Sequence, residues 1–118
     1  MKISAAQMKI MRVLWDADGP ITSKEIGERI PDNAWKYTTL VTTIGNLVDK
    51  GFVNSEKIRR KHAHLYWSAI TENDYAKSMT KEVLNTAYKG SMRNMITAIA
   101  DRQLTDEQFE RLMKIIEE

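Results

Sequence analysis

Three capping boxes mark where helices of this chain begin. In such a box a Ser or Thr side chain caps the first turn, and a Glu or Gln three residues later bonds back to the cap. The boxes are Ser4 with Gln7, Thr22 with Glu25, and Thr105 with Gln108. They predict helices over residues 4–16, from residue 22 through Ile30, and from residue 105 onward. Gly19-Pro20 stops the first helix and Pro31 ends the second.

Between the second and third boxes the hydrophobic period changes from helical to strand-like. A helix is predicted over about residues 37–50, with Gly51 as its left-handed C-terminal cap. Residues 52–56 and 64–68 are β-prone runs, and we expect them to form a hairpin. A cluster of cations lies between the runs and is placed in the turn: Lys57, Arg59, Arg60 and Lys61. A helix, a helix-turn-helix and a hairpin follow one another in a winged helix domain.

The remainder of the chain is predicted to be helical. Thr71 caps a helix that reaches about Tyr88, and Ser91 opens a second over about 92–101. We therefore expect a mainly α protein with a small β-hairpin. An N-terminal winged helix-turn-helix domain over 1–70 is followed by a C-terminal helical dimerisation region over 71–118.

Apolar side chains recur at helical spacing in these C-terminal helices and need a surface to pack against. We expect that surface to be a second copy of the chain, although packing back on the same chain and enclosing a small ligand are the alternatives. The predicted dimer interface consists of Met79, Val83, Tyr88, Met92, Met95, Ile96, Ile99, Phe109, Leu112, Met113 and Ile116.

The helix over 37–50 has an apolar face and an uncharged polar face. Leu40, Ile44, Leu47 and Val48 share the apolar face. Short hydrogen-bonding side chains lie on the other side: Thr38, Thr39, Thr42, Thr43 and Asn46. Such a face suits close approach to base edges in a DNA major groove. A plain solvated surface is the alternative, but the position before a basic hairpin favours a recognition helix.

Charge is distributed unevenly along the chain. The net charge of the chain is +2, yet residues 1–70 carry 11 Lys/Arg against 7 Asp/Glu, a net of +4. A basic first half favours contact with a polyanion. The residues expected to contact the DNA backbone are Lys36, Tyr37, Arg59, Arg60 and Lys61. A solubilising loop is the alternative for the hairpin cations.

Composition excludes several other classes of function. The chain has no cysteine, so it has neither a disulfide nor a thiolate metal site, and two histidines cannot complete a zinc site. The sequence has no glycine-rich phosphate loop and no catalytic triad, so we expect no enzyme activity, no metal and no cofactor. Without a long apolar run or a signal-peptide pattern, the chain is predicted to be cytoplasmic and not inserted in a membrane.

The residues resemble the penicillinase-repressor family, the BlaI/MecI repressors with their copper-responsive relatives. The resemblance rests on Ile3-Ser4-Ala5, on Met11 through Trp15, on the pattern from Trp35 to Phe52, and on residues 71–75 and 87–90. It implies a homodimeric, sequence-specific transcriptional repressor of resistance or stress-response genes. The partner implied is a double-stranded DNA operator with dyad symmetry.

Two departures from the family pattern affect these expectations. The recognition helix lacks the Lys or Arg that relatives often have, and Thr43 occupies a position that is usually apolar. The family also implies a membrane sensor-protease as a partner, but the Asn-Phe bond that is cut in well-known members is replaced by Thr97-Ala98-Ile99-Ala100. Two rival functions remain: a ligand-responsive winged helix regulator of the multiple-antibiotic-resistance type, and a winged helix module for protein interaction.

Overall fold

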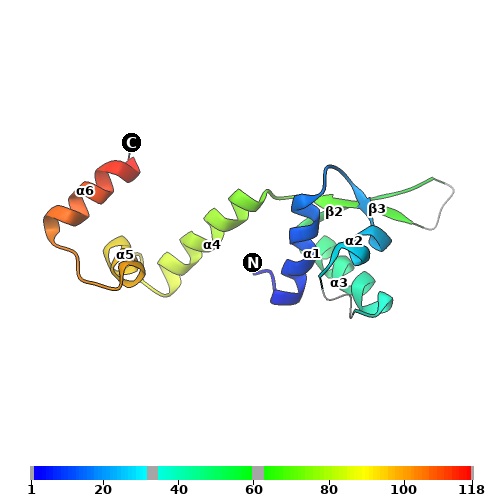
Figure 1. The fold of residues 1–118 in the computed structure, drawn as a ribbon, viewed down its shortest axis with the longest axis horizontal. Coiled ribbons are helices and arrows are strands. Elements are labelled where there is room, and N and C mark those ends of the chain that lie inside the picture. The colour runs from blue at the N-terminus through cyan, green and yellow to red at the C-terminus, as the bar shows by residue number, and fades with distance from the viewer. Residues whose placement is uncertain (1, 32–34, 60–62, 118) are drawn as a thin grey trace. The chain divides into compact units, whose positions relative to one another are not determined.

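A computed structural model describes residues 2–31, 35–59 and 63–117 of the chain (Figure 1). By contacts between its residues the chain divides into two compact units, Met1–Tyr75 and Ala76–Glu118. The elements in chain order are α1 (Ala5–Asp16), β1 (Ile21–Thr22), α2 (Ser23–Arg29), α3 (Tyr37–Asp49), β2 (Val53–Lys57), β3 (His64–Ser68), α4 (Glu72–Thr86), α5 (Met92–Ala100) and α6 (Asp106–Glu117). The prediction of a mainly α protein with a small β-hairpin is confirmed, and a further short strand extends that hairpin to a three-stranded sheet.

All three capping boxes form as the sequence predicts. Ser4 caps α1, and Thr22 caps α2 with Glu25 bonding back to its amide. At the start of α6 the Gln108 amide donates to Thr105 Oγ1 and the Thr105 amide donates to Gln108 Oε1, each at 3.1 Å. These bonds satisfy backbone N–H groups that a helix start otherwise leaves unpaired.

Gly51 ends α3 in the left-handed conformation, with φ +84°. The Gly51 amide donates to the Val48 carbonyl, and the Phe52 amide donates to the Leu47 carbonyl, both at 3.0 Å. This pair of bonds is the Schellman motif, in which the left-handed residue is most readily glycine. The motif reverses the chain so that β2 runs back along α3.

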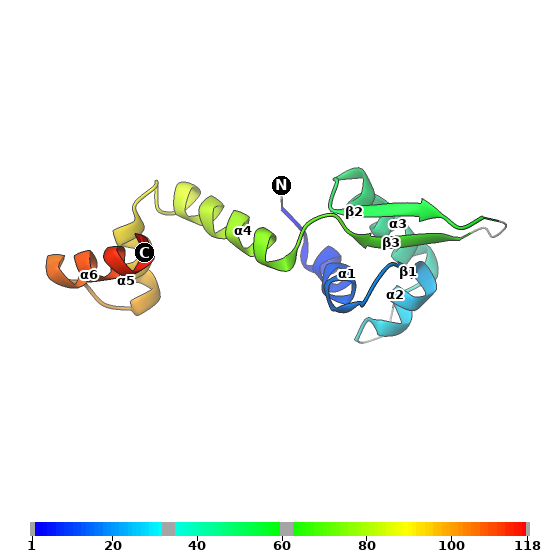
Figure 2. The ribbon, with the colours of Figure 1, turned by 90° about the horizontal axis from the view of Figure 1, so that it is seen from above.

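The three strands form one antiparallel sheet in the order β1-β3-β2 (Figure 2). In β2 and β3 the register pairs Val53 with Ser68 and Lys57 with His64. Two details differ from the prediction. The strand β1 was not expected, and Lys57 ends β2 instead of lying in the turn.

The core of the first unit lies between its three helices and the sheet. Its largest fully buried side chains are Ile10, Met11, Ile26, Ile44, Leu47 and Val53. Helix α2 approaches α3 closely at Gly27, where an added Cβ would lie 2.9 Å from Leu40 Cδ2. Gln7 is also buried, and its Oε1 accepts from Lys50 Nζ at 3.2 Å.

The first turn of α4 belongs to this core through Tyr75. The Tyr75 ring packs against Trp15 and edge-on against Phe52, with ring centroids 5.9 and 6.1 Å away. Its hydroxyl accepts from the Ile3 amide at 3.3 Å. Aromatic packing and a buried hydrogen bond therefore extend the first unit to Tyr75.

The second unit contains the rest of α4 together with α5 and α6. Of its described residues only Met95 and Leu104 are buried apolar side chains. Arg93 links α5 to α6 by an ion pair with Asp106 at 2.6 Å and by donating to the Leu104 carbonyl at 3.0 Å. Its guanidinium also lies over the Phe109 ring, 5.6 Å from the centroid. Arg93 thus makes ionic, hydrogen-bond and cation–π contacts between α5 and the segment from Leu104 into α6.

Candidate nucleic-acid interface

Helix α3 presents the predicted threonine-rich face to solvent. Thr38, Thr39, Thr42 and Asn46 are exposed, whereas Leu40, Ile44 and Leu47 are buried on the opposite side. The four threonines Thr38, Thr39, Thr42 and Thr43 line a shallow hollow of about 230 Å³. The helix therefore offers short polar side chains on an open surface while its other face anchors it to the core.

Thr43 contributes less to this face than its four neighbours. Its side chain is half-buried, and its hydroxyl donates to the Thr39 carbonyl at 2.8 Å. Within the chain that donor is already used, although the oxygen can still accept.

Val41 was not among the predicted contact residues, yet it lies on the open side of α3. Its side chain is 39% exposed. The signal in the sequence is that Val41 falls outside the i, i+4, i+7 series of the buried residues. An exposed methyl pair beside threonines suits contact with a thymine methyl group.

Lys36 and Tyr37 stand at the start of α3. Lys36 is exposed and forms no side-chain cap. Tyr37 is 60% exposed, and its hydroxyl shares a hydrogen bond with Ser23 Oγ at 2.8 Å. The Tyr37 phenol is therefore held in place by α2 while much of its ring remains open to solvent.

The hairpin reaches beyond the helices of its unit in both ribbon views (Figure 1, Figure 2). The side chains of Asn54 through Lys57 and of Arg59 are exposed. Beyond the strands the Ile58 amide donates to the Ala63 carbonyl at 2.9 Å. Two of the predicted wing contacts, Arg60 and Lys61, lie outside the described residues.

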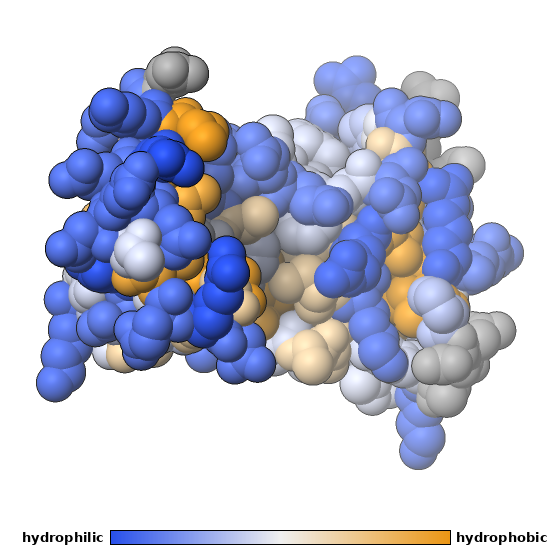
Figure 3. Space-filling view, turned by 60° about the vertical axis from the view of Figure 1, so that its left-hand side comes forward, coloured by the Kyte–Doolittle hydropathy of each residue, from blue (hydrophilic) through white to orange (hydrophobic). Residues whose placement is uncertain are grey.

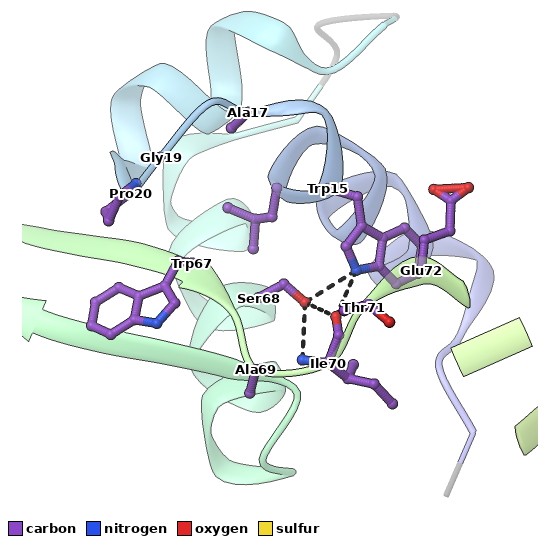
Figure 4. A pocket seen from close by; sticks show the side chains of 11 residues that line it. Trp15, Ala17, Gly19, Pro20, Trp67, Ser68, Ala69, Ile70, Thr71 and Glu72 are labelled. Atoms are coloured by element: carbon purple, nitrogen blue, oxygen red, sulfur yellow. Dashed lines mark hydrogen bonds between the residues drawn. The ribbon is translucent and has the colours of Figure 1, made fainter. Parts of the chain in front are cut away.

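A separate hollow of about 490 Å³ opens where α1 and β3 end (Figure 4). On one side of it the Trp15 indole donates to the Ile70 carbonyl at 2.9 Å and to Ser68 Oγ at 3.1 Å. Trp67 stands on the other side. The hydrogen bonds tie α1 to the segment that leads into α4, so Trp15 and Ser68 help to hold the first unit together.

The predicted dimer-interface residues differ in how far the single chain covers them. Val83, Ile99 and Ile116 are exposed, Ile99 by 77%, and apolar side chains reach the surface among charged ones (Figure 3). Met95 is buried within its own chain. The remaining seven are half-buried: Met79, Tyr88, Met92, Ile96, Phe109, Leu112 and Met113. Ile115 was not predicted, yet it is 68% exposed.

No group of three or more His, Asp or Glu side chains that could hold a metal ion occurs among residues 2–31, 35–59 and 63–117. Within the same residues no helix is both long and apolar enough to cross a membrane. Every buried side-chain nitrogen or oxygen that the structure describes has a hydrogen-bond partner. The buried polar side chains of the described residues are therefore satisfied by hydrogen bonds within the chain.

Comparison with known proteins identifies the family. The sequence profile described as penicillinase repressor matches residues 3–118. The chain belongs to the penicillinase repressor family. It is 30% identical over 118 residues to the penicillinase repressor of Bacillus licheniformis, covering 99% of this chain and 91% of that protein. It is 25% identical over 116 residues to the methicillin resistance regulatory protein MecI of Mammaliicoccus sciuri, covering 98% and 93%.

A solved structure supports the fold of this family member. The structure of PerR from Streptococcus pyogenes, a protein of peroxide sensing and gene regulation, aligns with a TM-score of 0.50 at 20% identity. It covers 58% of this chain and 48% of PerR. The winged helix fold is thus shown. Because the family consists of repressors and not of enzymes, the chain is a DNA-binding repressor without catalytic activity.

Proposed function

We propose that the chain represses transcription as a homodimer bound to an operator with dyad symmetry. The observation that carries the proposal is the open, uncharged threonine face of α3, held beside a projecting basic hairpin in a member of a repressor family. The α3 face would enter the major groove, and the hairpin cations would contact phosphates. In a dimer the two α3 helices would read half-sites about one helical turn apart or a multiple of it.

The genes under control are proposed to serve resistance or stress response, because the relatives are named for penicillinase and methicillin resistance. The proposal includes no cleavage step, since Thr97-Ala98-Ile99-Ala100 replaces the cleavable bond of well-known members. Induction by a sensor-protease is therefore not extended to this chain.

Binding to DNA from upstream of its own gene tests the proposal. Fluorescence anisotropy compares that duplex with a scrambled one across a salt series. We expect tight binding to the upstream duplex, weakening with salt, and saturation at two chains per site. Equal, feeble binding to both duplexes, or saturation at one chain, would contradict the proposal.

Two variants separate base reading from phosphate contact. Thr42→Ala should lower the preference for the operator, by about 1–3 kcal/mol, because it removes a side chain from the groove. Arg59→Ala should weaken binding to both duplexes alike and reduce the salt slope by about one for each protomer. Thr86→Ala, an exposed helical threonine in the second unit, is the matched control and should change neither quantity.

A further inference from the structure

Two indole rings border the hollow at the end of α1 and β3 (Figure 4). Trp15, in the last turn of α1, stands on one side of it, and Trp67, in β3, stands on the other. Apolar side chains of Leu14, Pro20 and Ile70 contribute to the lining. The volume of about 490 Å³ lies in the range of pockets that hold small molecules. The hollow therefore has the size and the aromatic lining of a ligand site.

The Trp67 indole is not used inside the chain. Trp67 pairs with Asn54, and the neighbouring pair is Val53 with Ser68. Successive residues of a strand point to opposite faces, so Trp67 lies on the face of the sheet away from the buried Val53. It forms no hydrogen bond and no ring contact with any residue that the structure describes. Its ring and its N–H group are therefore open to a ligand, whereas two hydrogen bonds already fix Trp15.

The electrostatic environment of the hollow is negative. Among the described residues that line it, Glu72 is the one with a charged side chain. Glu72 forms no ion pair with any other described residue. The end of α1 adds to this, because the last carbonyls of a helix carry partial negative charge and the last turn of α1 contains no basic side chain. The hollow therefore favours a cation and disfavours an anion.

We propose that the hollow between Trp15 and Trp67 binds an organic ammonium cation with an aromatic or apolar body. Indole faces attract such a head group, and the Glu72 carboxylate adds charge attraction. The body of the ligand packs against the apolar lining, for which an inorganic cation has no use. No described lining residue belongs to α3, so the site is separate from the threonine face and does not depend on the proposed function.

Indole N–H signals in NMR spectra of the full chain, titrated with benzyltrimethylammonium, test the proposal. The chain has three tryptophans, and Trp35 lines a different hollow, so its signal is an internal control. We expect the signals of Trp15 and Trp67 to shift together with one dissociation constant while that of Trp35 stays in place. A Trp67 signal that does not move at about 10 mM probe, or a shift of Trp35 alone, would overturn the proposal.

Two substitutions separate the carboxylate from the indole. Glu72→Gln should weaken binding of the probe about threefold to fivefold, because it removes the charge. Asp74→Asn is the matched control: it removes a carboxylate from the same turn of α4 that does not line the hollow, and it should change nothing. Trp67→Leu should weaken binding about tenfold, with the signals of Trp15 and Trp35 retained as evidence of folding. Equal effects of the two carboxylate substitutions, or a folded Trp67→Leu protein that binds like the wild type, would contradict the assignment.

The sign of the ligand's charge is tested with phenylacetate, an anion that carries the same phenyl ring. It should leave the Trp15 and Trp67 signals in place at concentrations at which benzyltrimethylammonium saturates them. If phenylacetate binds as tightly as the ammonium probe, the hollow selects the ring and not the charge, and a site for organic cations is refuted.

Discussion

The two units of the chain differ in how much of their apolar surface they bury. The first closes its core within one chain, with fully buried side chains contributed by both helices and sheet. In the second, the described residues bury only Met95 and Leu104, and Ile99, Ile115 and Ile116 remain exposed. Burial of apolar area is the main favourable term in folding, so the first unit is self-sufficient, whereas the second leaves apolar surface that the proposed dimer would cover.

The largest expected effect tests the closed core of the first unit. Leu47→Ala removes a fully buried side chain from α3 and should lower the free energy of unfolding by about 2–5 kcal/mol. Urea unfolding followed by circular dichroism measures it. Val41→Ala on the exposed side of the same helix is the control and should change stability by less than about 1 kcal/mol. Equal effects of the two would mean that α3 is turned differently about its axis.

Local signals in the sequence were sufficient to predict the helices of both units. Each capping box joins residues three apart, so its hydrogen bonds could be inferred from spacing alone, and Gly51 marked the end of α3 in the same way. The strand β1 was missed because it has two residues, too few for alternation to show, and exists only by pairing Ile21 and Thr22 with β3. Lys57 was predicted to lie in the turn because it belongs to the same cluster of cations as Arg59, Arg60 and Lys61.

The part of the candidate site that lies on α3 could be predicted from the sequence. The spacing of Leu40, Ile44 and Leu47 determined which side of α3 faces outward, and four of the five predicted reading residues are exposed there. The half-buried Thr43 sits at the edge between the two faces. The hydrogen bond between Ser23 and Tyr37 forms only because α2 packs against α3. No spacing within one segment could have indicated that.

The exposed apolar face of the second unit provides the next test. A substitution there should change dimerisation and leave the core of the first unit intact. Ile99→Asp should convert dimers to monomers in sedimentation velocity, because a carboxylate would be buried without a partner in the proposed interface. The cost is about 3 kcal/mol or more, enough to weaken dimerisation at least about 100-fold. Asn94→Asp adds the same charge on α5 at an exposed polar position and should leave the dimer intact. A dimer that survives Ile99→Asp would show that Ile99 does not lie in the dimer interface.

The smallest effect concerns how the second unit holds α5 to α6. Arg93 makes an ion pair, a hydrogen bond to the Leu104 carbonyl and a contact with the Phe109 ring, and Arg93→Gln removes the guanidinium group that makes all three. Because the ion pair is largely exposed, its share is small, and the sum should be about 1 kcal/mol. Hydrogen exchange of the α5 and α6 amides reports that local opening. Arg111→Gln, whose ion pair with Glu107 lies within α6, is the control and should cost about 0.5 kcal/mol or less. If both substitutions act equally, the contacts that Arg93 makes between α5 and α6 add nothing beyond a surface charge, and contacts in the proposed dimer would have to hold the two helices together.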